Sequence, residues 1–167
     1  GKVKILDRRV YPAKVEFATC RTHQEVAQAI TDMVTQSAGP YTAVPMGMAL
    51  AAHECRDQTA AEQMEYLRKA AYTISHARPT TVKRMALLCD ICISEAERAL
   101  AAGGDVAEAI RQKTIELNNV RYDRMATIGK YLVDMFPENG TVMTQCFAET
   151  IVGMMLRECT ERGKHIR

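Results

Sequence analysis

Residues 140–150 read GTVMTQCFAET, and this stretch decides which fold we expect for the C-terminal part of the chain. It predicts a short buried strand that runs directly into a helix, with Cys146 at the junction. Backbone N–H groups at a helix start lack intrahelical partners and carry partial positive charge, which favours a thiolate. Cys146 is therefore a candidate reactive thiol. The alternative is a small apolar residue that fills a strand–helix corner.

The residues after Cys146 continue this pattern. The helix is expected to run to Gly163, a residue suited to a C-terminal cap, and residues 164–167 (KHIR) resemble the start of a second strand. A strand, a helix and another strand form the opening of a parallel sheet, and one such strand cannot form a sheet by itself. We therefore expect the sheet that begins here to be incomplete within residues 1–167.

The preceding residues predict a β-hairpin at 3–17 and then a series of helices. Apolar residues recur at helical spacing, reaching Val34 in the first helix and Met135 in the long fifth one. The helix boundaries carry their usual signals, which are Thr22 with Glu25, Thr59 with Glu62, Pro79, Gly103 and Asp105.

The predicted fold class is mainly α, with a start of parallel α/β structure at the end. We expect a β-element at residues 1–20, a helical bundle at 21–137 and the start of an incomplete α/β domain at 138–167.

Composition narrows the function classes. The chain has 167 residues and a formal net charge of +2, and no basic run is interleaved with aromatic residues, which argues against nucleic acid as a partner. No apolar run is long enough for a membrane span. Six cysteines without secretory features indicate reduced thiols and a cytoplasmic protein.

Several weak candidate sites are interpreted as structural. Cys89 and Cys92 form a C-x-x-C inside a helical pattern without a second cysteine pair, so a zinc site is not expected. His53 and Glu54 begin like a zinc-protease motif, but Asp57 stands where the second histidine is required. His23, His76 and His165 have no constellation of chemical groups around them in the sequence. No metal site is predicted.

Six stretches, taken in order, resemble the N-terminal half of the methylthioribose-1-phosphate isomerase family. This family is related to the regulatory subunits of initiation factor 2B and to ribose-1,5-bisphosphate isomerase. The similar stretches are LDRRVYP at 6–12, EVAQAITDMV at 25–34, GMAL at 47–50, ARPTTV at 77–82, IG at 128–129 and GTVMTQC at 140–146.

The resemblance implies a fold, a reaction and partners. The family combines an N-terminal β-element and helical bundle with a Rossmann-like C-terminal domain, and its members typically form homodimers. Its isomerases convert a 1-phosphorylated aldose to the ketose without cofactor or metal, using a cysteine and an aspartate. The cysteine corresponds to Cys146, and the aspartate belongs to the part that follows Arg167. The expected partners are a small sugar phosphate, the C-terminal remainder of the protein and a second copy.

The resemblance also implies residues that bind substrate. Arg78 corresponds to the arginine of the T-R-P-T motif, which lines the pocket near the phosphate; the alternative is a surface arginine at a helix start. Gln36, Ser37 and Ala38 occupy the place of the family's R-G-A-P loop, without its arginine. They could contact substrate through amide, hydroxyl and backbone donors, or form a plain turn. Around the cysteine, Gln145 and Phe147 also differ from the family pattern.

Two main hypotheses about function follow. The first is an aldose–ketose isomerase of a 1-phosphorylated pentose, an intramolecular oxidoreductase of the methionine-salvage type, with residues 1–167 alone inactive. The second is a non-catalytic regulatory or ligand-sensing protein that resembles the initiation factor 2B subunits. A third reading takes the chain as one product of a split protein. The sequence does not determine the substrate's side group.

Overall fold

The computed structural model describes residues 1–145 and 148–167, with the backbone alone at residue 149. The chain forms two compact units, residues 1–115 and 116–167, and each is described by itself. The described residues are mainly helical with small sheets, as the sequence predicts. None of the described helices has the length and apolar composition that a membrane span requires.

The first unit begins with two strands, as predicted, but the second strand starts at Phe17, where the predicted hairpin ends. β1 (Val3–Leu6) and β2 (Phe17–Cys20) pair antiparallel, with Val3 opposite Cys20 and Leu6 opposite Phe17. Val3, Ile5 and Cys20 are buried in the core of this unit. The alternation of buried and exposed positions in β1 is the period-two pattern of a strand with one face on a core.

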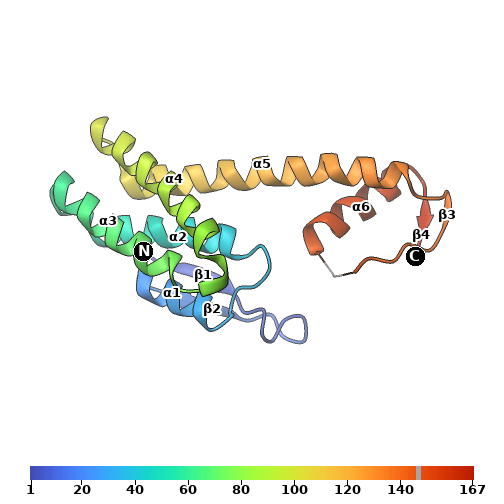
Figure 1. Ribbon diagram of the computed structural model, residues 1–167, viewed down its shortest axis with the longest axis horizontal. Helices are drawn as coiled ribbons and strands as arrows, with labels where there is room; N and C mark the ends of the chain where they lie inside the picture. Colours follow the sequence, from blue (N-terminus) through green and yellow to red (C-terminus); the bar gives the residue numbers. More distant parts are fainter. Residues whose placement is uncertain (146–147) are drawn as a thin grey trace. The chain divides into compact units, whose positions relative to one another are not determined.

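Four helices follow and pack side by side (Figure 1). They are α1 (His23–Thr31), α2 (Pro40–Glu54), α3 (Ala60–Ser75) and α4 (Val82–Ala101), with a 3₁₀ turn, η1 (Pro79–Thr81), before α4. α2 is buried on nearly all sides, as its small apolar residues predict. A Cβ on Gly47 of α2 would lie 2.9 Å from Val26 Cγ1 and 3.1 Å from Ile74 Cδ1. Glycine at this position therefore lets α1, α2 and α3 approach closely.

The predicted caps are present. The Thr22 and Thr59 side chains accept hydrogen bonds from the third residues of α1 and α3, and Asp105 accepts one from the Glu108 N–H at the start of α5 (Val106–Asp134). α4 ends where Gly103 adopts φ 67°, and the Gly104 N–H donates to the Ala99 carbonyl.

The first helix is shorter than predicted. α1 ends at Thr31, and Met33 adopts φ 59° so that the Val34 N–H donates to the Ala29 carbonyl at 2.9 Å. This is a Schellman cap made without glycine. Val34 is buried although it lies beyond α1, so its position in the apolar pattern indicates burial and not a longer helix.

The second unit contains the end of α5 and the strand–helix–strand pattern of the C-terminal stretch. β3 (Asn139–Gly140) and β4 (His165–Ile166) pair in parallel and are joined by α6 (Glu149–Glu161). Val133, Met155 and Cys159 form its buried core. α6 ends at the predicted glycine: Gly163 has φ 68°, and the Lys164 N–H donates to the Cys159 carbonyl.

Two predictions for this unit are wrong in detail. The buried strand expected to begin at Gly140 is not formed, because β3 ends at Gly140 and residues 141–144 are not strand. Both residues of β3 are exposed, and Met143 is 94% exposed. Met135, expected on the inner face of α5, is 72% exposed, whereas Val133 is fully buried. A parallel strand is buried when neighbouring strands and helices cover it, and here β3 pairs with two residues of β4. Residues 141–144 therefore have the apolar sequence of a buried strand but are largely exposed in the described structure.

Candidate functional site

The segment that contains Arg78 lies at the end of the first unit where α1 and α3 finish. The Thr31 hydroxyl, at the end of α1, donates to the Ala77 carbonyl at 2.8 Å. Arg78 follows with φ −140° and ψ 109°, the extended backbone expected before a proline. Its side chain is half-buried, and within the described residues it has no ion-pair partner. Arg78 is therefore positioned by its backbone, and its guanidinium remains available for an anion.

The loop of Gln36, Ser37 and Ala38 lies between the end of α1 and the start of α2. Ser37 has φ 52°, and the Gly39 N–H donates to the Gln36 carbonyl at 2.8 Å, so the loop is a tight turn. The Gln36 amide donates to the Met33 carbonyl at 3.2 Å. A Cβ on Gly39 would lie 1.9 Å from Thr35 Oγ1, so a larger residue here would require the Thr35 side chain to move. Gln36 thus holds the loop locally instead of offering a charge.

Two contacts bring this loop and the Arg78 segment to the same end of the first unit. The first is the hydrogen bond between Thr31 and Ala77. The second joins the starts of α2 and α4, because the Arg84 guanidinium lies over the Tyr41 ring at 5.4 Å from its centroid. We call this end, formed by residues 36–41 and 77–84, the loop end. The structure therefore gathers four of the five predicted site residues in one region.

The helices that begin beside predicted site residues differ from the others at their N-termini. α2 starts after Ala38, α4 after Arg78 and α6 after Cys146, and no side chain of a described residue caps them by a hydrogen bond. α1, α3 and α5 have such caps. At the start of α2, however, the N–H groups of residues 41–43 donate to the carbonyls of Ala38 and Gly39, so the missing side-chain cap leaves no free donor there.

Cys146, the predicted catalytic residue, lies outside the described residues, as does Phe147. The described cysteines are all buried. Burial raises the pKa of Cys89 to about 12, and burial followed by the nearby Cys89 raises the pKa of Cys92 to about 12. Both thiols are therefore protonated and inert near neutral pH. No group of three or more metal-ligating side chains occurs within residues 1–145 and 148–167, so Cys89 and Cys92 do not form part of one there.

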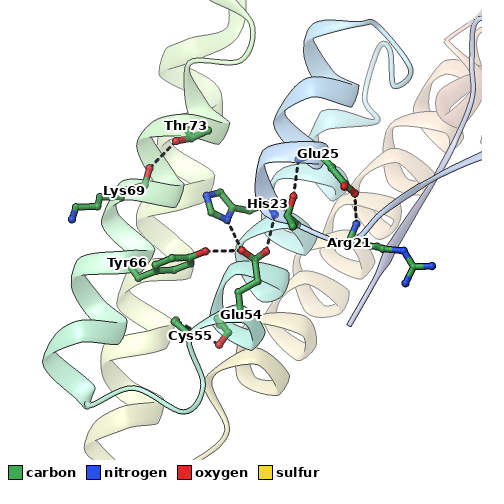
Figure 2. Close-up of polar contacts among 10 residues, drawn as sticks. Arg21, His23, Glu25, Glu54, Cys55, Tyr66, Lys69 and Thr73 are labelled. Atoms are coloured by element: carbon green, nitrogen blue, oxygen red, sulfur yellow. Dashed lines mark hydrogen bonds and ion pairs between the residues drawn. The ribbon is translucent and has the colours of Figure 1, made fainter.

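The prediction that His23 has no constellation around it is wrong. His23 is buried at the start of α1, and Glu54 at the end of α2 accepts from its backbone N–H at 2.7 Å and lies 2.9 Å from its Nδ1 (Figure 2). The Tyr66 hydroxyl of α3 donates to the same carboxylate at 2.7 Å. Burial, followed by the Glu54 carboxylate, raises the pKa of Tyr66 to about 12.

This cluster, His23 with Glu54 and Tyr66, we call the closed end. Each of its groups is satisfied by another, and the rings of His23 and Tyr66 also meet edge to face at 5.4 Å. Sequence reasoning missed it because Glu54 was considered only as part of a zinc motif. The sequence shows only that Glu54 ends an apolar helix, and this does not identify His23 or Tyr66 as its partners.

Comparison with known proteins identifies the family. The sequence model of the initiation factor 2 subunit family matches residues 37–167, and the chain belongs to this family. The methylthioribose-1-phosphate isomerase of Thermosipho melanesiensis is 26% identical over 174 residues, which cover 98% of this chain and 49% of that protein. The resemblance inferred from the sequence is thereby confirmed.

Solved structures show the same fold. Subunit delta of the translation initiation factor eIF-2B from Archaeoglobus fulgidus is 26% identical with a TM-score of 0.78, covering 98% of this chain and 50% of that one. The 5-methylthioribose 1-phosphate isomerase of Pyrococcus horikoshii has a TM-score of 0.76 at 21% identity, covering 98% and 48%. The chain spans about half the length of the curated relatives it matches.

Proposed function

We propose that residues 1–167 provide the N-terminal half of an aldose–ketose isomerase that acts on a 1-phosphorylated pentose of the methylthioribose type. In this proposal residues 1–20 are a β-element, 21–137 a helical bundle and 138–167 the start of a Rossmann-like domain. The coverage of about half of each relative supports the placement of this chain in an N-terminal half, whereas the internal boundaries rest on the sequence pattern. A homodimer in the cytoplasm, acting in methionine salvage, is part of the same proposal.

The observation that carries the proposal is the loop end. Arg78 has no ion-pair partner among the described residues, and it stands directly before η1, which leads into α4. An unpaired guanidinium presents a planar fork of donors that matches the oxygens of a phosphate. Residues 33–52 contain no charged side chain, so no acid from this loop competes for Arg78. Arg78 would bind the phosphate, while Gln36, Ser37 and Ala38 contact the sugar.

The chemistry requires two groups that handle protons. A sugar with a phosphorylated anomeric oxygen does not open to a free aldehyde, so hydrogen must move between adjacent carbons within a closed pocket. The hydrogen of the carbon next to the anomeric carbon moves to the anomeric carbon as the ring C–O bond breaks. The hydroxyl proton of that neighbouring carbon passes to the former ring oxygen as the ketone forms, so no external oxidant is consumed and two groups must handle these transfers. Cys146 would be one of these groups, and an aspartate in the C-terminal half would be the other. Residues 1–167 alone would then be inactive.

The regulatory alternative rests on two specific observations. The structural relative from Archaeoglobus fulgidus is an initiation factor subunit with a TM-score of 0.78. In addition, Gln36 replaces the arginine of the isomerase loop. A regulatory protein would bind a phosphorylated ligand without turning it over.

A fusion protein tests the isomerase proposal. Residues 1–167 are joined to the second half of the Thermosipho melanesiensis isomerase, which this chain does not cover. We expect the fusion to convert 5-methylthioribose 1-phosphate to the ketose. Cys146→Ser should lower kcat by a factor of about 10² to 10⁴, the contribution typical of a general acid or base.

Cys159→Ser is the matched control, because Cys159 is a buried thiol in the core of the second unit. It should change stability and leave kcat within about twofold. Full turnover by the Cys146→Ser fusion would remove Cys146 from the reaction. A folded fusion that binds phosphate without turnover would favour the regulatory alternative.

A further inference from the structure

Arg84 is the second unpaired arginine at the loop end. It is the third residue of α4, its side chain is exposed, and no acid among the described residues pairs with it. Its one described contact is with the Tyr41 ring, at 5.4 Å from the centroid. A guanidinium that lies over an aromatic face is held by cation–π attraction and keeps its N–H groups available at its edge. Arg84 is thus positioned without being neutralised.

The charge balance of the loop end favours an anion. Every charged side chain from residue 77 to residue 89 is basic, namely Arg78, Lys83 and Arg84, and residues 33–52 carry no charge. Asp32, at the end of α1, is the acid nearest in sequence to the loop, and it accepts a hydrogen bond from the Gln28 amide at 2.7 Å. Arg8 also lies beside the segment before α2, because its backbone N–H donates to the Val34 carbonyl at 2.9 Å, whereas the neighbouring Asp7 is paired with Arg9. The excess positive charge therefore comes from the start of α4, on the residues before and after η1, and from Arg8.

The loop before α2 lacks an arginine, because Gln36 is neutral, and the Arg84–Tyr41 contact lies next to this loop. The resembling isomerases have an arginine in the loop before α2, whereas Gln36 is neutral and bonds to Met33. Tyr41 belongs to the first turn of α2, directly after that loop. The contact between Arg84 and Tyr41 thus brings an arginine from α4 to the segment that lacks one.

We propose that Arg84, held against Tyr41, replaces the missing loop arginine as the second phosphate-binding cation of this site. The proposal rests on the proposed function, because it concerns the same phosphate group. Arg78 and Arg84 would then bind one phosphate from the two sides of η1, and Tyr41 acts as a positioning residue. An isomerase or a regulatory protein that binds a sugar phosphate would use the pair in the same way.

Inorganic phosphate is the probe, and its affinity for residues 1–167 is measured by NMR titration. We expect Arg84→Ala to weaken binding about fivefold and Arg84→Lys to restore part of it, since one charge-assisted contact is lost or partly kept. Arg68→Ala is the matched control. It removes the same charge from an exposed arginine on α3, one that pairs with Glu97, and should leave the affinity unchanged.

Tyr41 provides a separate readout of positioning. Tyr41→Leu should weaken phosphate binding about threefold in the natural background and have no further effect in Arg84→Ala, because the two residues act as one unit. If Arg84→Ala binds phosphate as tightly as the control Arg68→Ala, while Arg78→Ala binds more weakly, the role of Arg84 is wrong and the phosphate site at Arg78 stands. If neither Arg78→Ala nor Arg84→Ala weakens phosphate binding, or if residues 1–167 do not bind phosphate, the proposed phosphate site is wrong as well.

Discussion

The two ends of the α1–α2 pair differ in whether their charged side chains are paired with other described residues. At the closed end, Glu54 contacts His23 and the Tyr66 hydroxyl, and the polar groups satisfy each other within a buried cluster. At the loop end, Arg78 and Arg84 have no acidic partner among the described residues, and α2 and α4 start without a side-chain cap. Buried polar groups that are fully paired stabilise a fold, while cations without partners are left for a ligand.

Under the proposed function, the difference predicts that the closed end serves stability and the loop end serves binding. Satisfied groups offer no donor to a ligand, so substitutions at the closed end should change stability without changing phosphate affinity. Arg78 is half-buried and Arg84 is exposed, and neither forms an ion pair with a described residue. Substitutions at the loop end should therefore change phosphate affinity and leave stability nearly unchanged. Each prediction below tests whether the two effects separate in this way.

The largest effect on stability is expected for Glu54→Leu. Removing the carboxylate leaves the buried His23 and the Tyr66 hydroxyl without their acceptor, at a cost of about 3 kcal/mol in the free energy of unfolding. Urea denaturation followed by circular dichroism measures this change. The matched substitution Glu97→Leu, of an exposed acid paired with Arg68, should cost less than about 1 kcal/mol. Equal costs for the two variants would remove the distinction between the ends.

A smaller effect, on binding, is expected for Arg78→Ala. Phosphate affinity should fall about tenfold, equivalent to about 1.4 kcal/mol, because the guanidinium is the best-placed donor fork at the loop end. The free energy of unfolding should stay within about 0.5 kcal/mol of the natural chain, since no ion pair of the described residues is broken. Calorimetric titration and urea denaturation give the two values. A stability loss comparable to that of Glu54→Leu would show that Arg78 serves the fold.

The smallest effect is a pH dependence at the closed end. Because the folded-state pKa of Tyr66 is raised to about 12, mainly by burial, its neutral form is favoured in the folded chain. This contribution is complete below pH 10, the ordinary tyrosine value, and is lost as the pH rises through about 12. The natural chain should therefore lose more stability from pH 9 to pH 11 than Tyr66→Phe does. Tyr72→Phe, at a 67% exposed position, should behave like the natural chain.

Local signals made much of the fold predictable. The caps at Thr22, Thr59 and Asp105 and the glycine at 163 each depend on residues within one helical turn, and the structure confirms them. The end of α1 was missed because Met33 enters the left-handed region without being glycine. A methionine such as Met33 does not predict a turn from the sequence, as a glycine would.

Contacts between distant residues explain what the sequence did not reveal. His23 and Glu54 are 31 positions apart, and neither carries a mark that identifies its partner. The contact of Arg84 with Tyr41 likewise depends on how α2 and α4 pack. By contrast, Arg78 and the loop at 36–38 came from family resemblance, and the structure brings them to one end of the first unit. Their role in binding remains a prediction.

The most direct test of the central claim is a map of the amide shifts that inorganic phosphate causes in residues 1–167. We expect saturable shifts at the loop end, in residues 36–41 and 77–84, and unchanged positions for the amides of His23, Glu54 and Tyr66. Shifts centred on the closed end, or none that saturate, would contradict the assignment of binding to the loop end.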